Sequence, residues 1–362
     1  MSARRVVLIA VLLAACEHAA PFQPGDYGPS GPFSTTAPTR LTLNPGRDVA
    51  PTWLPGDAGI VYTAQRLDRV DGDNCFAVLP PGGGAISRYV CRTPGANDSI
   101  DAFWEAAVAP DGQLAYVRAS SMLPAIPFPA DAQALVVATL ADPNDARVLR
   151  TIPYTSPAGL VQGVSHIHWL SPTRLVFLSE DVTYPRASQS QDTVHTGLQI
   201  GVVDFSGATP VLTVVPGTSG ASSVAVGATA DTLYFTLAGD GRVLRYAFSS
   251  DATDVAHDFG AGRVAREAAV AGGRLFAVVD GRDDLGGDLH IVNLATGADS
   301  VTPAPTAGPL VLYRRLAPSA DGRRVVAQGR TVVIDTVPLG PGSVLIDTIP
   351  TSSADLWLHR LP

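Results

Sequence analysis

Hydrophobic residues along the chain occur in short runs in which they alternate with polar residues, and clusters of Gly, Pro and Asp separate these runs. Residues 198–204 and 242–248 are typical of the pattern. A period of two is characteristic of a half-buried strand, and Gly, Pro and Asp favour the turns between strands. The 35 Gly and 30 Pro also interrupt helices. The pattern therefore predicts an all-β protein with many tight turns.

A strand, a Pro/Asp/Gly turn and an apolar strand recur six times. The first copy reads Pro-Thr-Trp-Leu-Pro-Gly-Asp-Ala-Gly-Ile-Val-Tyr over residues 51–62, and the second reads Ala-Val-Ala-Pro-Asp-Gly-Gln-Leu-Ala-Tyr over residues 107–116. A further strand pair follows in most copies, which gives four strands per repeat, as in the blade of a β-propeller. The apolar anchors of the six second strands are Ile60, Leu114, Leu175, Leu233, Leu275 and Val325.

The repeat resembles that of the TolB-type family of exported β-propellers, whose pattern runs roughly P-x-W-S-P-D-G-x-x-I-x-F. The resemblance covers about residues 39–361 and is strong in copies one, two, three and six. It is weaker in copies four and five, which lack Pro at the turn. The resemblance implies a propeller fold and protein–protein association at the cell envelope.

Six anchors predict a six-bladed propeller of four-stranded antiparallel blades over residues 39–362. The last copy ends after its third strand, residues 355–360, and residues 39–43 supply a strand that could pair beside it. Such pairing would close the ring and remove two open sheet edges. Residues 332–350 add a hairpin to the last blade. A double β-sandwich is the alternative architecture for strands of this kind.

The N-terminus has the pattern of an export signal: two Arg, a short apolar run and then small residues. Leu-Ala-Ala before Cys16 resembles a bacterial lipobox, which implies cleavage after residue 15 and a lipid on Cys16. We therefore expect a signal peptide at 1–15 and a Pro/Gly-rich tether at 16–38. The family's sorting rules favour an outer-membrane lipoprotein facing the periplasm, held in the membrane by its lipid anchor only. The alternative is an ordinary signal peptide cut nearby.

Cys75 and Cys91 flank two candidate strands that a Pro-Pro-Gly-Gly-Gly turn joins. A hairpin brings its outer ends together, and an exported protein meets an oxidising compartment. A disulfide between Cys75 and Cys91 is therefore expected.

Composition excludes several kinds of chemistry. All 25 basic residues are Arg, so Schiff-base, pyridoxal-phosphate and P-loop chemistry, which need Lys, are absent. No Gly-x-Ser-x-Gly elbow occurs. A net charge of −8 makes nucleic acid an unsuitable partner. No cofactor and no catalytic residue are predicted, and the Asp-rich turns lack EF-hand spacing, so no metal site is predicted either.

Six residues align near the start of the innermost strands, where they would surround a central channel. Three of them, Glu105, His166 and Glu267, could converge on a ligand or cation. His166 and His168 lie two apart, and such a pair can begin a metal site. The alternative is a solvated polar rim whose members do not meet. The six aligned residues are Ala50, Glu105, His166, Ser223, Glu267 and Tyr313.

A second candidate is the connection at residues 121–129, in which eight of nine residues are apolar. An apolar loop at a solvent-facing position can mark an interaction surface. Its candidate contact residues are Met122, Leu123, Ile126 and Phe128. The alternative is a loop folded over a blade edge. The equivalent connection in the next copy, residues 180–196, is long and polar, so both enlarge the same face.

The sequence thus favours a non-enzymatic, exported scaffold lipoprotein that binds envelope proteins through a propeller. Two other classes remain open, both acting at the channel mouth. One is an enzyme, either a lyase or a metal-dependent hydrolase, and the other is a sensor of a small ligand or metal.

Overall fold

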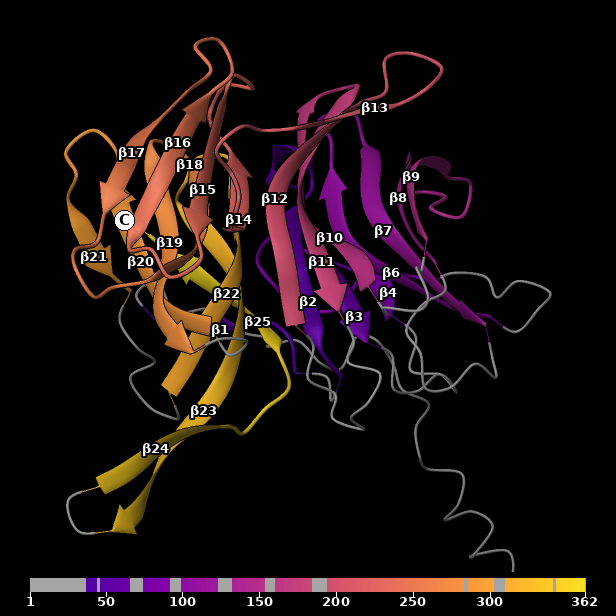
Figure 1. Cartoon of the computed structure of the whole chain (residues 1–362). Coiled ribbons are helices and arrows are strands. Elements are labelled where there is room, and N and C mark those ends of the chain that lie inside the picture. The colour runs from indigo at the N-terminus through magenta and orange to yellow at the C-terminus, as the bar shows by residue number, and fades with distance from the viewer. Residues whose placement is uncertain are drawn as a thin grey trace, which may run out of the picture.

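The computed structural model describes residues 37–43, 46–65, 74–91, 99–122, 132–153, 160–183, 194–282, 286–302, 310–340 and 343–361. Regular structure in these ranges is β-strand except for one 3-10 turn at Pro55–Asp57, η1 (Figure 1). No helix among the described residues is long and apolar enough to cross a membrane. The expected signal peptide, Cys16 and nearly all of the expected tether lie outside the described residues.

Four sheets of the molecule each contain four antiparallel strands that follow one another along the chain. The first sheet contains β2 (Asp48–Trp53), β3 (Ile60–Gln65), β4 (Asn74–Leu79) and β5 (Arg88–Val90). The second contains β6 (Ser99–Val108), β7 (Gln113–Met122), β8 (Ala132–Thr139) and β9 (Arg147–Pro153). The third contains β10 (Leu160–Ser171), β11 (Arg174–Thr183), β12 (Val194–Asp204) and β13 (Val211–Val214). The fourth contains β14 (Ala221–Val226), β15 (Thr232–Leu237), β16 (Arg242–Ala247) and β17 (Ala252–Asp258).

The remaining strands form one nine-stranded sheet made of two parts. The parts are joined at a single paired position, Gly287 with Tyr313. Gly286 permits this approach, since it has φ +100° and a Cβ atom there would lie 2.2 Å from the Tyr313 carbonyl oxygen. One part contains β18 (Ala265–Ala271), β19 (Arg274–Arg282), β20 (Gly286–Asn293) and β21 (Asp299–Val301). The other contains β22 (Leu310–Pro318), β23 (Arg324–Gly340), β24 (Ser343–Pro350), β25 (Asp355–Arg360) and β1 (Thr39–Arg40).

The first strands of the four-stranded sheets are β2, β6, β10 and β14, and those of the two parts of the nine-stranded sheet are β18 and β22. These six first strands lie against one another in chain order. β2 contacts β6, β6 contacts β10, β10 contacts β14, β14 contacts β18, β18 contacts β22, and β22 contacts β2. Apolar side chains fill the space between neighbouring sheets, as where Leu135 of β8 and Phe177 of β11 share one buried cluster. Such burial is the main favourable term in folding. The hydrophobic core is therefore distributed over the junctions between sheets.

The N-terminal strand lies beside the last one, as the sequence predicts, but it is shorter than expected. Only Thr39 and Arg40 pair with β25. Beyond them the ladder continues irregularly: Leu41 N donates to Leu356 O at 2.7 Å, and Thr42 Oγ1 accepts from Leu356 N at 2.9 Å. The Thr42 side chain thus replaces a backbone acceptor, which ends the strand before residue 43.

Two Trp residues of the repeat hold neighbouring sheets together. Trp53 Nε1 donates to Ala317 O at 2.8 Å, and Trp169 Nε1 donates to Ala107 O at 3.0 Å. The two Trp residues occupy equivalent positions, since Trp53 pairs with the anchor Ile60 and Trp169 with the anchor Leu175. Each acceptor lies one residue before the last residue of the neighbouring first strand. The Arg324 guanidinium lies 4.6 Å from the Trp53 ring centre. The repeated Trp therefore serves the junction between sheets.

Each first strand also contains a β-bulge. The register with the second strand shifts once in β2, β6, β14, β18 and β22, and twice in β10, between Ser165 and His168 and again between Trp169 and Ser171. In four of these strands a non-glycine residue at the bulge has a left-handed backbone. Such conformations cost about 1–3 kcal/mol each and persist only where the surrounding structure imposes them. The four residues are Ala50 (φ 50°), Glu105 (φ 59°), His166 (φ 50°) and Arg315 (φ 52°).

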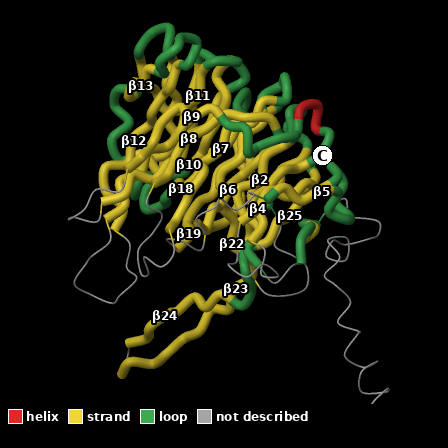
Figure 2. Tube along the Cα trace, turned by 90° about the vertical axis from the view of Figure 1, so that its right-hand side faces the viewer, coloured by secondary structure: helices red, strands yellow, loops and turns green. Residues whose placement is uncertain are grey.

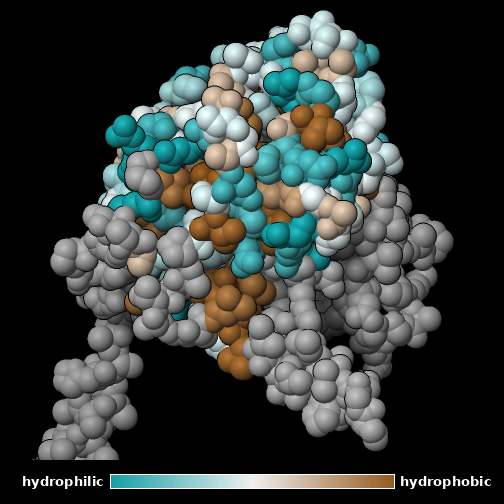
Figure 3. Space-filling view, turned by 90° about the vertical axis from the view of Figure 1, so that its left-hand side faces the viewer, coloured by the Kyte–Doolittle hydropathy of each residue, from teal (hydrophilic) through white to brown (hydrophobic). Residues whose placement is uncertain are grey.

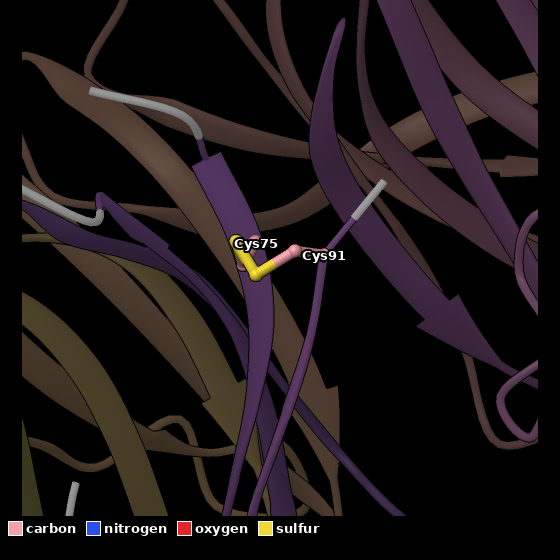
Figure 4. Close-up of a disulfide and its surroundings, with 2 residues drawn as sticks. All are labelled: Cys75 and Cys91. Atoms are coloured by element: carbon pink, nitrogen blue, oxygen red, sulfur yellow. A yellow bond between two sulfur atoms is a disulfide. The ribbon is translucent and has the colours of Figure 1, made fainter. Parts of the chain in front are cut away.

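The predicted disulfide is confirmed. Cys75 of β4 and Cys91, which follows β5, are bonded, with their Cα atoms 4.4 Å apart (Figure 4). The bond joins the outer ends of two paired strands in the first sheet. It closes only a short loop, so its expected contribution to stability is about 2–3 kcal/mol.

The expected hairpin in the last repeat is formed by β23 and β24, and it projects from the body of the molecule (Figures 1 and 2). Val333 and Ile349 pair directly at its base and are 48% and 43% exposed. The hairpin is inserted between β23 and β25, which are the second and third strands counted outward from β22. It therefore leaves the sheet at the position that corresponds to the predicted partner loop between β7 and β8.

Trp53→Phe should destabilise the protein by about 1–3 kcal/mol, because it leaves the Ala317 carbonyl without its indole donor. Trp357→Phe is the matched control, since the buried Trp357 Nε1 has no hydrogen-bond partner among the described residues. Equilibrium denaturation of both variants measures the difference. An equal loss in both would show that the indole–carbonyl bond contributes nothing.

Ala50→Gly should leave stability unchanged or raise it by up to about 1 kcal/mol, because glycine adopts the left-handed backbone without steric cost. Ala107→Gly, in regular strand of β6, should lower stability by about 1 kcal/mol. Thermal and chemical unfolding compare the two. A loss for Ala50→Gly as large as that for Ala107→Gly would contradict the strain assigned to the bulge.

Candidate functional site

The residues at the bulges of the six first strands form one layer, here called the polar layer, in which every member except Ala50 is polar. Strand pairing identifies its members, because each anchor lies opposite a residue near the end of its first strand, such as Val108 opposite Leu114. In each first strand, the residue three positions before the one that pairs with the anchor belongs to the layer, as Glu105 does before Val108. Its members are Ala50, Glu105, His166, Ser223, Glu267 and Arg315.

The sequence-based choice of Tyr313 for this layer is wrong. Arg315 occupies the position, whereas Tyr313 is buried with its ring 4.7 Å from that of His359. The turns between first and second strands differ in length, so counting along the chain from an anchor does not locate the equivalent residue. Arg315 could have been suspected from the Arg314-Arg315 pair, which interrupts an otherwise apolar strand.

The structure brings Glu105, His166 and Glu267 together, and Arg315 links them. Arg315 Nη2 lies 2.7 Å from Glu105 Oε1, and Nη1 donates to Glu105 Oε2 at 3.1 Å. Glu105 Oε2 also accepts from the His166 backbone N–H at 3.0 Å. His166 Nε2 lies 3.7 Å from Glu267 Oε1. The four side chains form a continuous network between β6, β10, β18 and β22.

Glu267 is held as a carboxylate. Its Oε2 accepts from Arg315 N at 2.6 Å and its Oε1 from Leu316 N at 3.0 Å. Burial by itself raises the pKa of a carboxyl group, but His166, the Arg315 charge and the Arg315 backbone donor outweigh it and lower the pKa of Glu267 to about 2. Glu267 is therefore ionised across the physiological range and has no proton to donate.

The two His residues of β10 differ in their surroundings. The His166 side chain is 10% exposed, and its Nδ1 lies 3.1 Å from Ser165 Oγ. Its Nε2 is buried and has no hydrogen-bond partner among the described residues. Burial, with a smaller effect of His166, lowers the pKa of His168 to about 4. His168 is therefore neutral at physiological pH.

The polar layer borders two cavities. The larger has a volume of about 450 Å³ and is lined by all six first strands together with turn residues such as Pro55 and Pro110. The smaller has a volume of about 190 Å³ and includes Arg266 and Arg314 in its lining. His166 and Glu267 line both cavities, whereas Glu105 and Arg315 line the larger one.

This network limits the chemistry of the channel. Glu105 is bound by a guanidinium and a backbone donor, and Glu267 by two backbone donors. Among the described residues no group of three or more His, Cys, Asp and Glu is placed to hold a metal ion. The arrangement is suited to joining four strands and to offering a few hydrogen-bonding groups to a ligand.

The predicted partner loop cannot be placed. Met122 is the last residue of β7. Leu123, Ile126 and Phe128 lie outside the described residues.

No family model matches the chain, and no curated protein matches it in sequence. Solved structures are similar in fold. A gluconolactonase from Xanthomonas campestris is 13% identical with a TM-score of 0.51, over 92% of this chain and 98% of that one. A luciferin-regenerating enzyme is 10% identical with a TM-score of 0.51, over 87% and 91%. A protein assigned as TolB from Agrobacterium tumefaciens is 10% identical with a TM-score of 0.47, over 88% and 92%.

These likenesses concern the fold alone. Together with the separate four-stranded antiparallel sheets, they show that the chain has a fold of the β-propeller type, as its repeat predicts. Propellers serve both as enzymes and as binding proteins, so the fold does not give the function.

Glu267→Gln should lower stability at neutral pH by about 1–3 kcal/mol, because an amide presents an N–H group to one of two backbone donors. The Glu267 pKa is about 2, below its ordinary value of 4.5. Its contribution is thus fully present above pH 4.5 and is lost as the pH falls towards 2. The variant should show a weaker pH dependence in this window by denaturant unfolding. Asp145→Asn, at an exposed position, is the control and should change neither quantity.

Proposed function

We propose that the protein is a TolB-type, six-bladed and closed β-propeller that binds other proteins at the cell envelope and has no catalytic activity of its own. Six blades follow if the nine-stranded sheet is counted as two, since its parts share a single paired position. The contacts that run from β2 through each first strand and back to β2 support a closed ring. The pairing of β1 with β25 supports the same arrangement.

The observation that carries the binding function is that both carboxylates of the cluster are occupied by hydrogen bonds within the protein. A general acid or base needs a pKa near the working pH and access to a substrate proton. Glu267 meets neither condition, because its pKa is about 2 and two backbone N–H groups occupy its oxygens. Glu105 is engaged by Arg315 and by the His166 backbone. The acidic residues nearest the axis thus stabilise the fold, which leaves the outer loops and edges as the functional surface.

The enzyme class is the alternative, and two similar structures are enzymes by name. At 13% and 10% identity they share the fold, and their activities do not transfer to this chain. Lactone hydrolysis needs an activated water or a nucleophile. Among the described residues that line the larger cavity, the carboxylates of Glu105 and Glu267 are already hydrogen-bonded within the protein. The two remaining candidates are His168, which is neutral, and His166, whose Nε2 has no hydrogen-bond partner.

The connections between second and third strands supply the proposed interaction face. In the second sheet this connection is the apolar loop that follows Met122, and in the last it is the projecting β23–β24 hairpin. Figure 3 shows a narrow column of hydrophobic atoms at the bottom centre of the view, with hydrophilic and hydrophobic atoms mixed above it. An apolar surface of this kind is typical of association sites.

We also propose that the chain reaches this location as a lipoprotein. Cleavage before Cys16 and lipidation of that residue would anchor it, and the Pro/Gly-rich residues 16–38 would hold the propeller away from the membrane. A lipid anchor and an envelope partner both require export, with which the Cys75–Cys91 disulfide is consistent.

Replacing Met122, Leu123, Ile126 and Phe128 by Ser should abolish partner capture in envelopes, because it removes the apolar contact surface. Capture is measured by in vivo crosslinking and mass spectrometry, and the unfolding temperature should stay within a few degrees of wild type. Gln189→Ala with Gln191→Ala, in the equivalent polar connection of the third sheet, is the control and should retain capture.

Cys16→Ser should release the protein from membranes.

Two results would contradict this function. One is an unchanged crosslinking profile for the four-Ser variant. The other is hydrolysis of gluconolactone by the purified protein faster than the spontaneous reaction, with loss of that rate in Glu105→Gln or His166→Gln.

A further inference from the structure

The larger cavity combines apolar walls with a small polar floor, which consists of Glu105, His166, Glu267 and Arg315. Its volume of about 450 Å³ falls within the range of small-molecule sites, roughly 300–1,000 Å³. Ala225, Ala269 and Ala317 hold equivalent positions in β14, β18 and β22, and all three line the cavity. Because alanine ends at Cβ, these strands leave the space open.

The floor contains a buried polar atom with an unused hydrogen-bonding capacity. His166 Nε2 has no partner among the described residues, and the Glu267 oxygen nearest to it, at 3.7 Å, is beyond hydrogen-bond distance. Leaving such a group unpaired costs about 1–3 kcal/mol. His166 also has a left-handed backbone, and strained residues of this kind concentrate at binding sites.

We propose that this cavity binds a small, uncharged and largely apolar molecule whose hydroxyl group bonds to His166 Nε2. A hydroxyl both donates and accepts, so it can pair with Nε2 in either imidazole tautomer. Where Nε2–H donates to the hydroxyl oxygen, the hydroxyl hydrogen remains available to donate to Glu267 Oε1, which lies 3.7 Å from Nε2. The apolar body of the ligand packs against the Ala and Val side chains of the wall.

The charges of the floor disfavour the two obvious alternatives. A carboxylate ligand would meet Glu105 and Glu267, and the Arg315 guanidinium is already bound to Glu105. An ammonium group would have to lose its water shell between apolar walls, which is costly for a charge without a dedicated partner. At the mouth the Asp57 carboxylate is paired with Arg324 at 3.1 Å. A neutral head group avoids these penalties.

This site is separate from the proposed partner surface. The cavity opens among the turns that join first and second strands, at Pro55–Asp57, Pro110 and Ala320. The partner surface consists of connections between second and third strands, which leave an antiparallel sheet at the opposite end. Ligand binding and partner capture can therefore fail independently.

Three probes with one apolar body test the ligand class: 1-adamantanol, 1-aminoadamantane and adamantane-1-carboxylate, titrated into the purified protein at pH 7 by calorimetry. We expect the alcohol to bind at least about tenfold more tightly than either charged probe. Binding of a charged probe as tightly as the alcohol would overturn the ligand class. Absence of binding by all three would overturn the site.

Variants locate the binding. Ala225→Leu narrows the cavity and should weaken alcohol binding by at least about tenfold, whereas Ala252→Leu, on the exposed strand β17, should not change it. His166→Phe removes Nε2 and should weaken binding about five- to tenfold. If Ala225→Leu fails to fold, Ala225→Val is the milder filling variant. Wild-type affinity in a folded filling variant would overturn the proposed location.

Discussion

The bulge in each first strand is the constraint on which the centre of this molecule depends. At the bulge, one residue each of β6, β10 and β22 adopts a left-handed backbone conformation. These residues are Glu105, His166 and Arg315, and the bulges place them in one layer. The same shift exposes backbone N–H groups of His166 and Arg315 to carboxylates on the neighbouring first strands. Strain at the bulges is thus offset by charge-assisted hydrogen bonds, which are stronger than neutral ones.

The network determines what the channel can do. Its carboxylates hold backbone donors and a guanidinium, so they brace four strands and are not free for acid–base chemistry. They border a larger cavity, whose lining includes the short turns between first and second strands, and a smaller cavity, whose lining includes Arg266 and Arg314. A rigid support with variable connections at one end and a small cavity at the other suits a binding protein.

Much of the fold could be predicted because its signals are local. Alternating residues define strands, Pro-Asp-Gly defines the turns, and the hairpin that joins Cys75 to Cys91 sets their separation. The repeated Trp could be found but not explained, since its acceptors at Ala107 and Ala317 belong to other sheets. The polar cluster could be predicted in part, since the aligned repeats indicate Glu105, His166 and Glu267 but not Arg315.

The sequence by itself determined the repeated strands, their turns and the set of polar residues near the axis, because each depends on neighbours within a few positions. The tertiary structure alone decided which residue of β22 enters the layer, because bulges and turns of unequal length shift the register between copies. It also decided that the polar side chains meet and contact one another. That outcome depends on distances between strands up to 210 residues apart in the chain, as for Glu105 and Arg315.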